Sequence, residues 1–211
     1  QNLTGKIRTA TSLSIQRKFH VELEGLVGRY FPERKAEIRA YAELLASAGI
    51  ERGLIGPREG ERIWERHILN CLHITTLLPQ GAELFDIGSG AGLPGIVIAF
   101  ARPDLKVTLI EPLERRVEFL HEAVAGTSIQ VLRGRAQDVK QRADFVTARA
   151  VAPLEKLQKL TWHLIKPGGA LLAMKGESAA REMESVEGAI LHEIELEGVG
   201  LGRIVELKRV K

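Results

Sequence analysis

Apolar residues in the first part of the chain recur at three- and four-residue spacings, the period of an α-helix with one buried face. Two stretches show this period, Ala36–Ala48 and Glu59–Leu78. Glycines and a proline within Gly49–Pro57 interrupt it, and Pro79 and Gly81 end the second stretch. The pattern therefore predicts an α-helical N-terminal extension over residues 1–80.

After Gly81 the pattern changes to short runs of Val, Ile, Leu and Phe that alternate with helical periods. Strands alternating with helices favour right-handed crossovers and a mostly parallel sheet. The predicted strands are Glu83–Ile87, Val107–Glu111, Ile129–Arg133, Asp144–Ala148 and Ala170–Lys175. The predicted helices are Gly95–Ala101, Glu114–Val124, Pro153–Ile165 and a weaker Ala136–Gln141. Two half-exposed strands, Met183–Glu197 and Arg203–Val210, are expected to pair as an antiparallel C-terminal edge.

These elements predict an α/β fold, a doubly wound, mostly parallel sheet in one compact core over residues 81–211. The 211 residues are 45% hydrophobic and 27% charged, as in ordinary globular chains. A single cysteine, Cys71, excludes an intrachain disulfide and favours a reducing compartment. The polar leading segment lacks the apolar core of a signal peptide, and no stretch approaches the roughly 20 apolar residues of a membrane span. We expect a cytoplasmic protein that does not bind a membrane.

Charge is distributed unevenly along the chain, although the formal net charge is only +3. Residues 177–197 hold seven glutamates and one arginine, a local charge of −6. The rest of the chain has 29 basic and 20 acidic residues, a charge of +9. Such a basic body favours a polyanionic partner.

A glycine-rich loop, Gly88–Gly95, joins the first predicted strand to a helix. Ligands of open α/β sheets bind at the carboxyl ends of the strands, and glycines let backbone N–H groups approach them. Gly90, Gly92 and Gly95 fit a dinucleotide fingerprint, but that register starts beyond the strand end and places Pro94 inside the turn.

In the alternative register a carboxylate, Asp86, stands at the strand end before Gly88, Gly90 and Gly92. A carboxylate there would repel a diphosphate but can hold an amine or order water, so a zwitterionic amino-acid tail suits the loop better. Glu111 ends the second strand 23 residues after Gly88, where such folds place an acid that accepts ribose hydroxyls. The alternatives are a turn residue for Asp86 and a helix-capping acid for Glu111.

The segment Asp86–Gly95 resembles the S-adenosylmethionine loop of class I methyltransferases, and more narrowly that of the bacterial 16S ribosomal RNA (guanine-N7) methyltransferases, the glucose-inhibited division protein B family. Three further segments resemble elements of this family in the same order: Arg66–Asn70, Ala148–Leu154, and Gly168-Gly169 with Lys175-Gly176. The similarity extends from about Tyr41 to the C-terminus. It implies S-adenosyl-L-methionine as cofactor and 16S ribosomal RNA or the small ribosomal subunit as partner.

The resemblance also implies which residues contact the cofactor. They are Asp86, Gly88, Gly90, Leu93, Glu111, Ala136, Gln137 and Arg149. The family usually has an acid where this chain has Gln137, so a hydrogen bond to the adenine amine would use an amide oxygen. The family's Asn-Leu-Thr element before Arg66 is replaced by Gly53–Pro57.

Guanine N7 carries a free lone pair at neutral pH, so methyl transfer to it needs correct orientation and no catalytic acid, base or metal. Arg149 then suits a contact to the cofactor, a phosphate or guanine O6. Arg66, Arg149 and Lys175 are the candidate substrate-binding residues. Arg66 has no acidic neighbour three or four residues away, so we expect its charge to be free. His67 and His73 lie six residues apart, a poor spacing for a metal pair.

Two other functions remain open from the sequence. One is a class I methyltransferase that acts on a small molecule, which the basic body of the chain disfavours. The other is a non-catalytic Rossmann module that binds RNA or NAD. We expect the protein to be a monomer.

Overall fold

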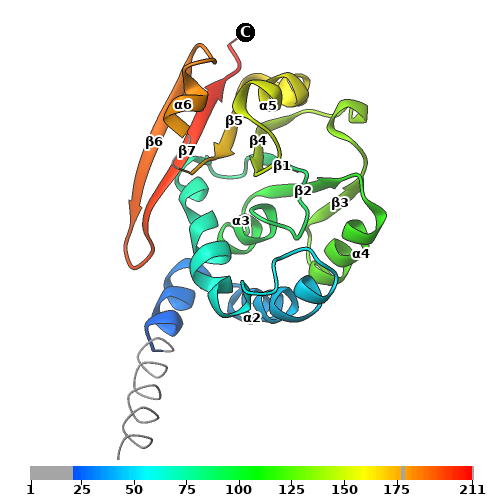
Figure 1. Cartoon of the computed structure of the whole chain (residues 1–211), viewed down its shortest axis with the longest axis vertical. Coiled ribbons are helices and arrows are strands. Elements are labelled where there is room, and N and C mark those ends of the chain that lie inside the picture. The colour runs from blue at the N-terminus through cyan, green and yellow to red at the C-terminus, as the bar shows by residue number, and fades with distance from the viewer. Residues whose placement is uncertain (1–20, 177–178, 211) are drawn as a thin grey trace, which may run out of the picture.

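A computed structural model describes residues 21–176 and 179–210. Its seven-stranded sheet has the order β3-β2-β1-β4-β5-β7-β6 (Figure 1). The strands are β1 (Glu83–Ile87), β2 (Lys106–Glu111), β3 (Gln130–Arg133), β4 (Ala143–Arg149), β5 (Ile165–Met174), β6 (Ala189–Leu196) and β7 (Gly200–Lys208). Strands β1 to β5 are parallel, whereas β7 pairs antiparallel with β5 and with β6. The doubly wound, mostly parallel sheet and its antiparallel C-terminal edge are thus confirmed.

Helices α3 (Gly95–Ala101), α4 (Glu114–Ala123) and α5 (Leu154–Thr161) lie close to their predicted positions. Three predictions within the core are wrong in part. Strand β5 begins at Ile165, the residue expected to end the preceding helix. The strand expected from Met183 begins only at Ala189, because Met183 ends the short helix α6 (Ala179–Met183) and packs against the core. The helix expected over Ala136–Gln141 is a single 3₁₀ turn, η5 (Ala136–Asp138).

The N-terminal extension is helical but irregularly wound. Residues 21–30 form a helix, and α2 (Lys35–Leu44) continues into a π turn, η1 (Leu45–Gly49). The second predicted helix is divided into η2 (Gly60–Arg62), η3 (Ile63–Ile68) and η4 (Leu69–Leu77), of 3₁₀ and π type. The spacing of apolar residues does not reveal this, because η3 and η4 still bury apolar residues such as Ile63, Ile68 and Leu72.

The core consists of two apolar clusters, one on each side of the sheet. The first joins the extension to α3 and the sheet through residues such as Ile38, Leu72, Ile96 and Leu109. The second packs α5 and α6 against the sheet. In Figure 1 the extension and α3 lie together on one side and the β6–β7 hairpin stands at the margin. The extension therefore contributes to the same core that supports the glycine loop.

His73 holds the extension to the C-terminal hairpin. Its Nδ1 and Nε2 lie 2.9 Å from the carbonyl oxygens of Asn70 and Gly200, and a Cβ on Gly202 would lie 2.3 Å from its ring. The role of His73 is therefore structural. Within residues 21–176 and 179–210, no helix has both the length and the apolar character needed to cross a membrane.

Candidate functional site

The glycine loop after β1 depends on glycine at several positions. Gly88, Gly90 and Gly92 have φ angles of +65°, +56° and +93°, a region that favours residues without a Cβ. Gly95 begins α3, and a Cβ there would lie 2.4 Å from Leu109 Cδ2 and 2.7 Å from Asp86 Oδ2. The loop thus combines unusual backbone geometry with tight packing at the carboxyl end of the sheet.

Asp86 supports this loop from below. The residue is 0% exposed, and its Oδ2 accepts a hydrogen bond from the Gly95 N–H at 3.0 Å. Its Oδ1 has no hydrogen-bond partner among residues 21–176 and 179–210, and burial raises the pKa of this carboxyl to about 7. We expected a carboxylate able to hold an amine, but the structure directs it at the loop backbone because the polypeptide closes over it.

Glu111 connects the end of β2 to the same loop. Its Oε2 accepts from the Gly90 N–H at 2.9 Å and its Oε1 from the Leu113 N–H at 3.0 Å. Arg116 Nη1 lies 3.6 Å from Oε2, and the Glu111 side chain is only 1% exposed. The carboxylate thus binds two backbone amides, one of them in the loop, and still lies in the wall of a cavity.

That cavity, of about 650 Å³, opens at the carboxyl ends of β1, β2 and β4. Its size is that of a small-molecule site. Five of the sequence-predicted residues line it: Gly88, Gly90, Leu93, Glu111 and Arg149.

Three of the predicted cofactor residues do not line the cavity. Asp86 lies beneath the loop. Ala136 is buried in η5, where its carbonyl oxygen lies 3.1 Å from His163 Nε2, and Gln137 is exposed beside it.

Several residues that sequence reasoning did not assign also line the cavity: Leu54, Ile55, Gly56, His67, Leu113 and Arg116. The first three belong to the segment that replaces the Asn-Leu-Thr element, so its position before Arg66 was a usable signal. Leu113 carried another signal, its position directly after Glu111-Pro112, and the structure leaves it 46% exposed. His67 had none, because its partners are distant in the sequence.

His67 lies between the side chains of Arg149 and Glu59. Arg149 Nη2 is 2.7 Å from His67 Nδ1, and His67 Nε2 is 2.9 Å from Glu59 Oε2. Arg66 Nη1 donates to the other carboxylate oxygen of Glu59 at 2.9 Å. The expectation that the charge of Arg66 is free was wrong, because Glu59 lies seven residues back, in the turn that precedes the helix.

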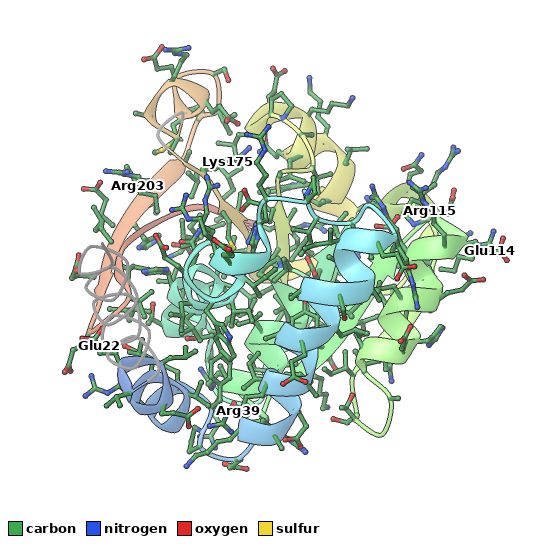
Figure 2. All side chains as sticks on the ribbon, turned by 60° about the horizontal axis from the view of Figure 1, so that its bottom comes forward. Glu22, Arg39, Glu114, Arg115, Lys175 and Arg203 are labelled. Atoms are coloured by element: carbon green, nitrogen blue, oxygen red, sulfur yellow. The ribbon has the colours of Figure 1, made fainter. Side chains whose placement is uncertain are left out.

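Lys175 follows β5 and lines a second cavity, of about 470 Å³, together with Arg203 of β7 (Figure 2). Its Nζ donates to Glu182 Oε2 at 2.7 Å and to the Ala152 carbonyl oxygen at 2.9 Å, with 10% of the side chain exposed. Its charge is therefore already paired. Residues 149–151 line both cavities and form the partition between them.

Cys71 is fully buried beside this partition, and burial raises the pKa of its thiol to about 11. It therefore behaves as a small apolar residue rather than as a nucleophile. Across the described part of the chain, His, Cys, Asp and Glu side chains form no group of three that could hold a metal ion.

Known proteins resemble this chain over most of its length. Residues 34–199 match the model of the GidB family, described as rRNA small subunit methyltransferase G. The ribosomal RNA small subunit methyltransferase G of Thermobifida fusca (strain YX) is 53% identical over 170 residues, covering 78% of this chain and 72% of the relative. That of Frankia alni (strain DSM 45986 / CECT 9034 / ACN14a) is 46% identical over 193 residues, covering 85% and 74%.

Solved structures show the same fold at low sequence identity. A SAM dependent methyltransferase from Aquifex aeolicus aligns with a TM-score of 0.53 and 19% identity, covering 77% of this chain and 98% of that one. A methyltransferase from Pyrococcus furiosus aligns with a TM-score of 0.53 and 15% identity, covering 66% and 81%. With a family model that spans most of its length and relatives about half identical to it, the chain belongs to the GidB family of rRNA small subunit methyltransferases G.

Proposed function

We propose that this protein transfers the methyl group of S-adenosyl-L-methionine to N7 of a guanosine in the 16S RNA of the small ribosomal subunit. One observation carries the proposal: the loop Gly88–Gly95, bound by Glu111, walls a cavity of about 650 Å³ in a chain of this family. The charge of +9 outside residues 177–197 supports a polyanionic substrate.

The residues present fit such a cofactor. A Cβ on Gly88 would lie 3.0 Å from Val151 Cγ2, a tight contact, so glycine at this position leaves space beside the cavity. We assign Gly88, Gly90 and Leu93 to the amino-acid tail, Glu111 to the ribose hydroxyls, and the exposed Leu113 to an apolar face of the base. Asp86 acts through the loop that it supports.

Two further contacts are assigned outside the cavity lining. The turn η5 follows β3, next to the β2 end that carries Glu111. We propose that Ala136 and the amide oxygen of Gln137 meet the adenine edge there. Arg149 completes the site from the end of β4.

Methyl transfer to N7 requires the side chains mainly to orient the base relative to the methyl group. S-adenosyl-L-methionine, when bound, supplies an electrophilic methyl group. Because N7 attacks through a free lone pair, the protein has only to hold the base in line with that group and to exclude other geometries. The base becomes cationic, so Arg149 serves better at a phosphate or at O6 than over the ring.

The decisive experiment is transfer of labelled methyl to unmodified 16S RNA and to unmodified 30S particles, followed by mapping of the modified base. Modification of one guanine at N7 is the expected result. A protein that binds S-adenosyl-L-methionine but methylates neither RNA would refute the assigned substrate. Calorimetry that detects NAD binding without S-adenosyl-L-methionine binding would refute the assigned cofactor.

A further inference from the structure

Arg149 lies between the two cavities and lines both of them. It ends β4, and residues 149–151 line both the cavity of about 650 Å³ and that of about 470 Å³. The next residue, Ala150, has a φ of +53°, which residues with a Cβ rarely adopt. The chain therefore turns sharply just after Arg149, and its side chain needs support from elsewhere.

That support comes from uncharged acceptors. Arg149 donates to His67 Nδ1 at 2.7 Å, to the His67 carbonyl oxygen at 3.4 Å and to Cys71 Sγ at 3.6 Å. Among residues 21–176 and 179–210, no carboxylate forms a salt bridge with it. The guanidinium is thus held in place while its charge stays available to the cavities.

The contacts also fix the protonation of His67. A guanidinium only donates, so Nδ1 must present its lone pair, and the ring is neutral with its proton on Nε2. That proton is donated to Glu59 Oε2 at 2.9 Å. Burial and the charge of Arg149 lower the pKa of His67, whereas Glu59 opposes them, and the net direction is downward.

We propose that Glu59 and His67 are positioning residues that orient Arg149 at the partition between the cavities without neutralising it. A carboxylate in direct contact would hold Arg149 equally well but would offset its charge. The neutral imidazole holds the guanidinium in place without offsetting its charge, because Glu59 fixes the imidazole and the imidazole fixes the guanidinium. The inference rests on the proposed function, because the substrate supplies the anionic or electronegative group that Arg149 meets.

The first test is spectroscopic and uses the wild-type protein. In protein with ¹⁵N-labelled histidine, two-bond ¹H–¹⁵N correlations at pH 7 should show His67 with Nε2 protonated and Nδ1 unprotonated. A doubly protonated ring or the opposite tautomer would overturn the proposal. This result does not depend on methyl transfer, so it separates failure of this proposal from failure of the proposed function.

The second test is kinetic and compares two variants of one residue. His67→Asn keeps an acceptor near the position of Nδ1, whereas His67→Gln moves the amide toward that of Nε2 and loses the contact with Arg149. We expect His67→Gln to lower kcat for unmodified 30S particles by about 10- to 100-fold, the scale of a misplaced contact in a site. His67→Asn should retain most of the activity.

Two further variants distinguish the effect of the Glu59–His67–Arg149 contacts on kcat from a general effect on stability. Glu59→Gln keeps an acceptor for Nε2 but removes the charge, so a smaller loss of kcat than in His67→Gln is expected. Glu65→Gln is the matched control and should leave kcat unchanged, because the salt bridge that Glu65 forms among the described residues is with exposed Arg62, at 3.1 Å across the junction of η2 and η3. Equal activity of His67→Gln and His67→Asn, with both variants folded by circular dichroism, would overturn the proposal.

Discussion

The hydroxyl of Tyr41, in α2, donates a hydrogen bond to the carbonyl oxygen of Ala91, in the glycine loop, at 2.8 Å. Tyr41 is fully buried and its ring meets Phe100 edge to face, with centroids 6.4 Å apart. The helical extension is thus a structural support of the loop, fifty residues away in the sequence.

Tyr41→Phe should weaken both the fold and the loop. Removing the hydroxyl leaves the buried Ala91 carbonyl without its donor, which costs about 1–3 kcal/mol of unfolding free energy. Denaturant unfolding measures this loss, and calorimetry should show weaker S-adenosyl-L-methionine binding. Tyr30→Phe is the control, because the Tyr30 hydroxyl binds the Glu197 carbonyl oxygen at an exposed position. An equal loss in both variants would contradict the role given to Tyr41.

Gly95→Ala should destabilise the protein by about 1–3 kcal/mol, the typical effect of an overpacked core. The new Cβ would lie 2.4 Å from Leu109 Cδ2 and 2.7 Å from Asp86 Oδ2, both in buried strands. Thermal unfolding of the variant tests this. Gly134→Ala is the matched control, because its Cβ would meet nothing within 4 Å. If Gly95→Ala were as stable as Gly134→Ala, the packing beneath the loop would be looser than described.

Glu111→Gln should weaken cofactor binding by about 1–3 kcal/mol, the scale for a lost charged hydrogen-bond acceptor. The side-chain NH₂ group of glutamine would also face one of the two backbone N–H groups that now donate to Glu111, which disturbs the geometry of the loop. Calorimetry measures the affinity. Glu114→Gln is the control, since Glu114 points outward from α4 (Figure 2) and, within the described part of the chain, forms a salt bridge with Arg133 alone, at 2.8 Å. Unchanged affinity in Glu111→Gln would refute the ribose assignment.

Asp86 should make the free energy of unfolding fall as pH rises, the opposite of the usual effect of a carboxyl group. Burial raises the pKa of its carboxyl from 3.8 to about 7, so the native state keeps a proton that the unfolded chain releases between these values. The free energy of unfolding should therefore fall as pH rises from about 4 to 7, then level off. Asp86→Asn should flatten this fall in denaturant titrations, whereas Glu118→Gln, at an exposed carboxylate of α4, should not. Parallel curves for wild type and Asp86→Asn would exclude Asp86 as the source.

The sheet and the glycine loop could be predicted from the sequence because their signals are local. A strand such as Glu83–Ile87 is an apolar run ended by glycine, and the loop carries its own spacing of glycines. The position of Glu111 at the end of the second strand was predicted from the same kind of pattern, whereas its hydrogen bond to Gly90 in the loop was not. At the C-terminal edge the predicted strand began too early, because its first residue, Met183, ends a helix of strong helix formers, Ala179–Met183.

The contacts around Arg149 could not be predicted in the same way. They join Glu59, His67 and Arg149 across three separate segments, and no local spacing encodes such a meeting. The pairing of Lys175 with Glu182 was hidden for a similar reason, because it depends on the short helix α6. Rules for helical neighbours find ion pairs only within a regular helix, and the segment before Ile63 is not one.

Strand β6, which lies in the acidic C-terminal segment, forms an edge of the sheet. It is the outermost strand of the sheet, so one row of its backbone N–H and C=O groups could pair with a strand of another molecule. Glu193 and Glu195 are exposed along it, while Ile190 is also 43% exposed. Glu193 forms a salt bridge with Arg203 of β7 at 2.9 Å. Like charges on approaching edges repel each other, so the charge of Glu195 disfavours edge-to-edge pairing of two folded molecules.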